Sequence, residues 1–188
     1  LLPIIPLKSV VLTDEQKKMY TAVLRGNLNL SHARFLKGCS GYNLDVICRT
    51  PLWQIGMDYK HGTGHGVGCY LNDHEGPTNF ANARVPMEEG MVISIEPGIY
   101  RAGMLGVRTE NLVTVVRDKR SDEFGQFFRF EPLTLCPINT QAIETKMLSR
   151  SEVAWLNQYH SYVFEQLSPM LEPEERKWLG AATAPLHI

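Results

Sequence analysis

His61-Gly62-Thr63-Gly64-His65-Gly66-Val67-Gly68, followed closely by Asn72-Asp73-His74-Glu75-Gly76-Pro77, is the most informative segment of this chain. Three imidazoles stand close together among glycines and a proline, which is not typical of a filler loop. Imidazole nitrogens and carboxylate oxygens are the usual ligands of Zn and Mn. The glycines allow the backbone and a ligand to approach each other without Cβ clashes. The segment therefore favours a metal-dependent hydrolase.

Two carboxylates follow this segment. Glu96 ends the apolar run Met91-Val92-Ile93-Ser94-Ile95, which indicates a buried strand, and an unpaired carboxylate there would be costly. Glu110 lies in a second strand expected over 107–116. Because side chains alternate along a strand, Arg108 and Glu110 are expected on the same face. One histidine and these two carboxylates are enough for a three-point metal site.

The composition excludes several classes of protein. The chain has 188 residues, 44% of them hydrophobic, and a formal net charge of −1. It therefore lacks the basic character that nucleic-acid or anionic-lipid binding requires, and no apolar run is long enough to span a bilayer. No secretory leader is recognisable, and the four cysteines form no CxxC pair. Free thiols and a cytoplasmic location are expected.

Local patterns predict the remaining elements. Thr13-Asp14-Glu15-Gln16 and Ser149-Arg150-Ser151-Glu152 are capping boxes, which open helices expected over 14–36 and to about Leu167. A second helix is expected over 43–56, and Pro51 should split or kink it. Further along the chain we expect a hairpin around Gly103 and Gly106, a polar loop over 118–125 and a strand over 127–135. A short helix is expected near 174–179. The expected organisation is a non-matching segment over 1–12, a main domain over 13–145 and a helical extension over 146–188.

The motifs occur in an order that resembles one family. They are His-Gly-Thr-Gly-His-Gly-Val-Gly, Leu-Asn-x-His-Glu-Gly-Pro, Glu-Pro-Gly-x-Tyr, Val-Arg-Thr-Glu-Asn and Phe130-Glu131-Pro132-Leu133-Thr134-Leu135. This order looks like the C-terminal part of a cytosolic-type Xaa-Pro aminopeptidase, or aminopeptidase P, a pita-bread metallopeptidase. The resemblance implies an α+β chain with a partial pita-bread fold. In that fold a curved, mostly antiparallel sheet is backed by helices, here with a C-terminal helical tail.

The resemblance also implies roles for individual residues. His65, Glu96 and Glu110 look like metal ligands, and Arg108 looks like a residue that holds a carboxylate in place. His74 would contact the substrate near the scissile carbonyl, and His61 would line the proline pocket. The implied reaction is release of an N-terminal residue that precedes proline, by a water activated by Mn or Zn. The implied substrate is a peptide with proline at its second position.

The family pattern contains two further Asp ligands for which this sequence has no counterpart, because no Asp precedes Asp14. Asp45, Asp58 and Asp73 are judged poor substitutes. We therefore expect one metal or none where the intact family holds two, and weak or absent activity of the isolated chain. A partial sheet also favours a homodimer or association with a complementing chain. Two alternatives stay open, a non-catalytic pita-bread binding or scaffold module and a prolidase-like dipeptidase.

Overall fold

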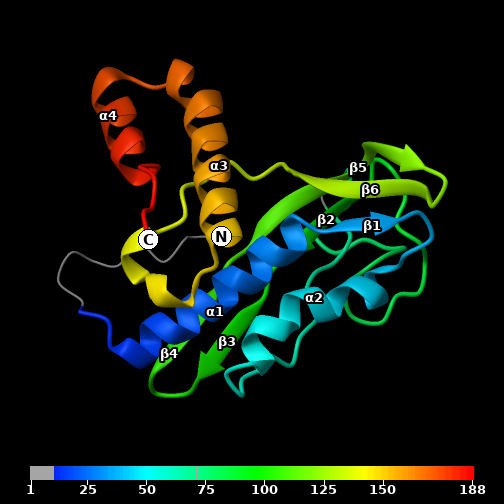
Figure 1. Ribbon diagram of the computed structural model, residues 1–188, viewed down its shortest axis with the longest axis horizontal. Helices are drawn as coiled ribbons and strands as arrows, with labels where there is room; N and C mark the ends of the chain where they lie inside the picture. The colour runs from blue at the N-terminus through cyan, green and yellow to red at the C-terminus, as the bar shows by residue number, and fades with distance from the viewer. Residues whose placement is uncertain (1–10, 71) are drawn as a thin grey trace. The chain divides into compact units, whose positions relative to one another are not determined.

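Helix α1, Asp14–Ser31, is the first element of the computed structural model, which describes residues 11–70 and 72–188. The chain forms two compact units (Figure 1). One contains the residues up to Thr21 together with Leu135–Ile188, and the other contains Ala22–Thr134. Most of the predicted segment 1–12 lies outside the described residues, and the predicted boundaries at 12 and 145 stay predictions.

The unit over 22–134 is built on an antiparallel sheet. Its four strands lie in the order β1-β6-β5-β2, and a second pair, β3-β4, forms a hairpin. The bounds are β1 Arg34–Leu36, β2 Val92–Ile95, β3 Gly98–Arg101, β4 Leu105–Arg108, β5 Asn111–Asp122 and β6 Gly125–Pro132. Together with α1 and α2, Gly41–Trp53, these strands confirm the α+β class and the mostly antiparallel sheet.

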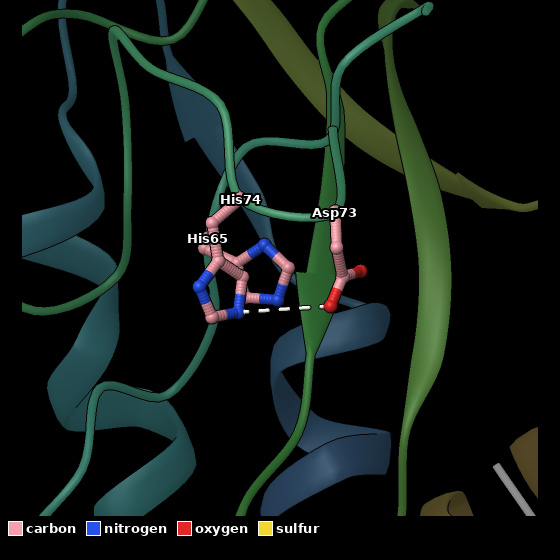
Figure 2. Close-up of side chains that lie close together, drawn as sticks. All are labelled: His65, Asp73 and His74. Carbon is pink, nitrogen blue, oxygen red and sulfur yellow. Dashed lines mark ion pairs between the residues drawn. The ribbon is translucent and has the colours of Figure 1, made fainter. Parts of the chain in front are cut away.

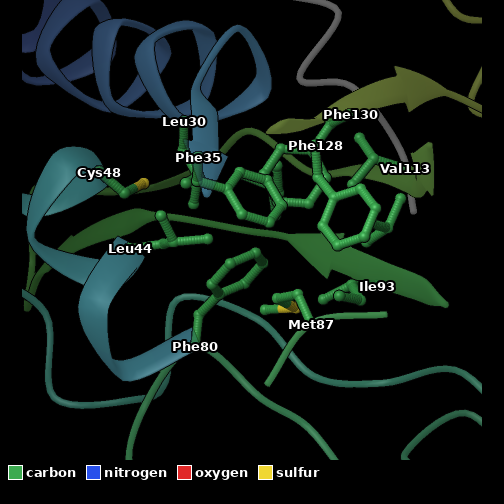
Figure 3. Packing of buried hydrophobic residues seen from close by; sticks show 12 residues of the cluster. Leu30, Phe35, Leu44, Cys48, Phe80, Met87, Ile93, Val113, Phe128 and Phe130 are labelled. Carbon is green, nitrogen blue, oxygen red and sulfur yellow. The ribbon is translucent and has the colours of Figure 1, made fainter. Parts of the chain in front are cut away.

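The core of this unit lies where the two helices meet the sheet (Figure 3). Leu44 and Cys48 of α2 pack in one cluster with aromatic rings of the sheet and of a loop. Phe80 is fully buried, which stabilises the fold by about 2–3 kcal/mol, and its backbone N–H donates to the carbonyl of Gly64 at 2.9 Å. The core therefore anchors the histidine segment directly. The whole cluster comprises Leu30, Phe35, Leu44, Cys48, Phe80, Met87, Ile93, Ile95, Val113, Val115, Phe128 and Phe130.

Two helix predictions need correction. The helix expected to reach residue 36 ends at Ser31, because Arg34–Leu36 pairs with β6 and buries Phe35. The helix expected over 43–56 spans 41–53 and is not split at Pro51. Pro51 lies in the last turn, so its missing N–H removes only one hydrogen bond of the helix.

The strand predictions need correction too. The strand expected over 107–116 is interrupted at residues 109–110, and the hairpin at Gly103 joins β3 to β4. Simple alternation therefore does not carry over from Arg108 to Glu110. The polar loop expected over 118–125 is instead strand as far as Asp122, and the following strand spans 125–132.

The other unit is mainly helical. Its helices are η1 Thr140–Ala142, η2 Thr145–Met147, α3 Arg150–Leu167, η3 Ser168–Met170 and α4 Pro173–Ala182, besides the first turns of α1. Both capping boxes are confirmed, since Gln16 N–H donates to Thr13 Oγ1 at 3.2 Å and Glu152 N–H to Ser149 Oγ at 3.2 Å. The predicted helical tail is confirmed as well. None of the helices in the described residues is long and apolar enough to cross a membrane.

Candidate metal centre

His65 is fixed by backbone contacts with β2. Its N–H donates to Ser94 Oγ at 3.0 Å, and Ser94 N–H donates back to the His65 carbonyl at 2.9 Å. The preceding residue must be small, because a Cβ on Gly64 would overlap the carbonyl oxygen of Ser94. The glycine therefore allows the segment to lie directly against the strand that leads to Glu96.

His65 and Glu96 face each other at the end of β2. His65 Nε2 lies 3.3 Å from Glu96 Oε1, and the glutamate is only 7% exposed. The other imidazole nitrogen, Nδ1, lies 3.0 Å from the Gly66 carbonyl. A backbone carbonyl at Nδ1 and a carboxylate at Nε2 are the surroundings typical of a metal-binding histidine, in which Nδ1–H donates to the carbonyl and Nε2 binds the metal.

Arg108 holds the second oxygen of Glu96. Its Nη1 donates to Glu96 Oε2 at 2.8 Å, and its Nε donates to the Tyr100 hydroxyl at 2.7 Å. The predicted role of Arg108, to hold a carboxylate in place, stays a prediction. The observed contact with Glu96 supports it.

Glu110 enters the same electrostatic environment from the break between β4 and β5. Its pKa is raised, first by burial and then by the charge of Glu96, while the charges of Arg108 and His65 oppose the rise. A carboxyl group whose pKa is raised by a neighbouring carboxylate, close to an imidazole, is a suitable place for a cation.

A buried amide of α1 joins the two segments that carry these carboxylates. Asn27 is 2% exposed, and its Nδ2 donates to the carbonyls of Ile95 at 3.0 Å and Thr109 at 3.3 Å. These residues immediately precede Glu96 and Glu110. Asn27 was not identified from the sequence, where the one available signal was an amide in the middle of an amphipathic helix.

His74 lies against His65, and Asp73 lies beside both (Figure 2). The two imidazole centroids are 3.8 Å apart, and His74 Nε2 is 3.8 Å from Asp73 Oδ2. The ligand atoms of the three residues all lie within 4.8 Å of one another. Asp73 was expected to be a poor substitute for the missing Asp ligands, and that expectation stays a prediction, although its carboxylate lies beside the two imidazoles.

His61 lies at the other end of the segment, among aromatic rings. It stacks on Tyr59 at 4.8 Å and meets Tyr100 edge-on at 5.5 Å between ring centroids. Its Nδ1 lies 2.7 Å from the Gly62 carbonyl, and among the described residues its buried Nε2 has no hydrogen-bond partner. Tyr100 therefore contacts both His61, through its ring, and Arg108, through its hydroxyl group.

Arg49 of α2 holds the loop that carries His61. Its guanidinium donates to Asp45 at 2.6 Å, to Asp58 at 2.9 Å, and to the carbonyls of Tyr59 and His61 at 2.9 Å each. Burial acts to lower the pKa of Arg49. The hydrogen bonds to Asp45 and Asp58, together with the charges of Tyr59 and Asp45, outweigh burial, and the pKa is raised. The spacing of Asp45 and Arg49 along a helix was the signal in the sequence for this contact.

The residues present fit a divalent cation. His65 offers an oriented imidazole nitrogen, and Glu96 offers an oxygen 3.3 Å from it. Glu110 is a second carboxylate, close enough for the charges of Glu96 and His65 to act on it. Nitrogen with carboxylate oxygen is the donor set of Zn and Mn sites.

Comparison with known proteins places the chain in a family of metallopeptidases. Residues 8–117 match metallopeptidase family M24, and residues 126–186 match the C-terminal region of peptidase M24. Aminopeptidase P1 of Arabidopsis thaliana is 42% identical over 92% of this chain and 28% of its own length. The chain thus spans less than a third of that relative.

Two solved structures are similar as well. The X-prolyl aminopeptidase of Caenorhabditis elegans, described as a cytosolic enzyme with a di-nuclear active site, is 36% identical with a TM-score of 0.89, over 96% of this chain and 30% of that chain. The Xaa-Pro dipeptidase of Bacillus anthracis is 30% identical with a TM-score of 0.53, over 68% of this chain and 33% of that chain. The expected partial pita-bread fold is confirmed by the first of these.

Proposed function

Because the chain belongs to metallopeptidase family M24, we propose that it carries part of the site of an Xaa-Pro aminopeptidase, which releases the N-terminal residue of a peptide with proline second. The observation that carries the proposal is the pairing of His65 Nε2 with Glu96 Oε1 at 3.3 Å, with Glu110 in the same field. A bound Mn or Zn would supply Lewis acidity and an activated water there.

The chain's own residues have separable roles in this proposal. His65, Glu96 and Glu110 bind the cation. Arg108 keeps Glu96 oriented through its 2.8 Å hydrogen bond, and this contact also offsets part of the cost of burying the carboxylate. His74, whose side chain is 74% exposed, is free to meet the substrate near the scissile carbonyl.

His61 would face the proline ring. It lies between Tyr59 and Tyr100, and an imidazole flanked by aromatic rings offers an apolar wall suited to a pyrrolidine ring. Arg49 would keep that wall in place by holding the carbonyls of Tyr59 and His61.

We also propose that the isolated chain is weakly active or inactive, since the two further Asp ligands of the family pattern have no counterpart in its sequence. With only His65, Glu96 and Glu110 as ligands, the isolated chain should bind one metal ion or none. The test is release of the first residue from an Xaa-Pro tripeptide in the presence of Mn. Full activity of the chain alone would contradict the proposed weakness, and no activity even after association with a complementing chain would contradict the proposed function.

Association with a second copy or a complementing chain belongs to the same proposal. β1 is an outer strand of the sheet, and apolar side chains at the same end, Leu36 and Phe124, are exposed. An exposed apolar sheet edge favours pairing with another chain. Sedimentation would show a dimer or larger species, and a monodisperse monomer would refute this part. A cytoplasmic location is proposed by analogy with the C. elegans enzyme, described as cytosolic.

A prolidase-like dipeptidase and a non-catalytic module are the alternatives. The higher identity and wider coverage of the aminopeptidases disfavour the first, and the retention of all three ligand residues disfavours the second. Comparing a dipeptide Xaa-Pro with a longer peptide of the same first two residues separates the enzyme classes, because an aminopeptidase cleaves the longer one.

A further inference from the structure

Asp73 lies beside His65 and His74, and the proposed function gives it no role (Figure 2). Its side chain is 89% exposed, and its Oδ2 lies 3.8 Å from His74 Nε2. A carboxylate and two imidazoles therefore converge at the solvent side of the candidate centre.

We propose that His65, Asp73 and His74 form a ligand set of their own for one divalent ion of the Zn²⁺ class. This set shares His65 with the carboxylates Glu96 and Glu110, so the two sets compete for the same imidazole. The inference does not depend on peptidase activity.

The chemistry of the three donors suits such an ion. Two imidazoles and one carboxylate make a three-ligand zinc site in which a fourth position stays open to solvent. His65 is already oriented, because its Nδ1 lies 3.0 Å from the Gly66 carbonyl, and its Nε2 is the nitrogen for which Glu96 and Asp73 would compete through a bound ion.

The three ligand atoms need to move only slightly closer together to bind zinc. The three ligand atoms lie within 4.8 Å of one another, whereas tetrahedral zinc with bonds of about 2.0–2.1 Å requires ligand atoms roughly 3.3 Å apart. His74 and Asp73 are 74% and 89% exposed, so their side chains can rotate inward without disturbing packed neighbours.

Charge favours Asp73 over Glu96 as the anionic partner. Glu96 is already compensated by the guanidinium of Arg108 at 2.8 Å. The Asp73 carboxylate faces the His74 imidazole at 3.8 Å rather than a guanidinium. A cation reaching His65 from solvent therefore meets an uncompensated carboxylate first.

The test is a Zn²⁺ titration of the full chain by calorimetry, with four single variants. Asp73→Asn and His74→Gln should each weaken Zn²⁺ binding about tenfold or more, while Glu110→Gln should change it less than about threefold. Glu123→Gln, which removes an exposed carboxylate of the β5–β6 turn, is the matched control and should leave binding unchanged. Circular dichroism would verify that each variant folds.

Every outcome decides the question. If Asp73→Asn behaves like Glu123→Gln while Glu110→Gln weakens binding, this inference is overturned and the proposed ligands of the peptidase site stand. If the wild-type chain binds no Zn²⁺, the inference also falls, whereas the proposed function is still judged by peptide cleavage after association with a complementing chain. Loss of binding in both Asp73→Asn and His74→Gln, but not in Glu110→Gln, supports it.

Discussion

The side-chain amide of Asn27 donates to the carbonyl of Ile95 at 3.0 Å, the residue before Glu96. Its second hydrogen reaches the carbonyl of Thr109 at 3.3 Å, the residue before Glu110. One amide group of α1 therefore sets the separation between the two segments that carry the carboxylates.

Replacing Asn27 with Ala should weaken both the fold and the centre. The buried carbonyl of Ile95 and the partly buried carbonyl of Thr109 each lose a donor, which costs about 1–3 kcal/mol for a buried group left unsatisfied, and the carboxylate segments lose their common anchor. We expect a lower midpoint in urea denaturation and faster hydrogen exchange over residues 95–96 and 109–111.

Asn157→Ala is the matched control for this experiment. Asn157 makes a comparable pair of hydrogen bonds, to the carbonyl and the N–H of Leu186, in the other unit of the chain. It should lower stability without changing exchange over residues 95–96 and 109–111. Equal exchange effects from both variants would contradict the anchoring role of Asn27.

Replacing Arg49 with Ala should release the loop that carries His61. The guanidinium is only 12% exposed, and its loss leaves Asp45 without its cation, so we expect a destabilisation of about 3 kcal/mol. Arg49→Lys should retain part of the stability, because an ammonium cannot serve both carboxylates and both carbonyls at once. The free energy of unfolding in urea measures both.

The exposed pair Arg117–Glu89, at 2.6 Å, supplies the comparison. Arg117→Ala should cost less than about 1 kcal/mol, because solvent screens that pair. If Arg49→Ala were equally mild, the guanidinium would not be holding the loop.

His160 should make the fold sensitive to acid. It is fully buried, its Nε2 accepts from Ile138 N–H at 3.0 Å, and burial lowers its pKa to about 4. The unfolded chain, with a pKa near 6.5, takes up the proton first, so stability is full above about pH 6.5 and falls as the pH drops toward about 4. The loss between pH 8 and pH 5 should be about 2 kcal/mol.

Urea denaturation at several pH values measures this slope. His160→Gln retains an acceptor but cannot titrate, so its stability should vary less between pH 6.5 and 4. His187→Gln, which changes an exposed histidine, should keep the wild-type slope. A slope that His160→Gln leaves unaltered would assign the acid sensitivity to other groups.

Gly64→Ala should be strongly destabilising, because the new Cβ would overlap the Ser94 carbonyl and push the histidine segment away from β2. We expect a loss of about 2 kcal/mol or more in thermal or urea unfolding. Gly180→Ala is the opposite case, since its Cβ would meet only Phe164 at 3.5 Å within a helix. That change should stabilise the chain by up to about 1 kcal/mol, and similar losses from both variants would contradict the packing argument.

The sequence predicted those parts of the fold that local chemistry determines. The capping boxes at Thr13 and Ser149 begin helices as expected, because each cap is completed within four residues. Helix α1 ends early because Phe35 gains more by pairing with Phe128 in the sheet, a partner far along the chain. That kind of competition cannot be read from a local pattern.

The candidate site shows the same division. The motifs indicated His65, Glu96 and Glu110, whose residue types bind metals. Asn27 and Arg49 were not identified, because both residues bind backbone carbonyls. Every residue has a backbone carbonyl, so the sequence does not indicate which one a side chain will contact. Asp73 was dismissed for its position in a linking segment, yet that segment folds back onto His65.

The pairing of β1 with β6 also bears on folding kinetics. Phe35 and Phe128 are register partners, although nearly the whole unit separates them along the chain. The β5–β6 hairpin can form from neighbouring residues, whereas β1 must wait until the long intervening loop has closed at an entropic cost. We therefore expect the edge strand β1 to dock late in assembly, after the β5–β6 hairpin has formed.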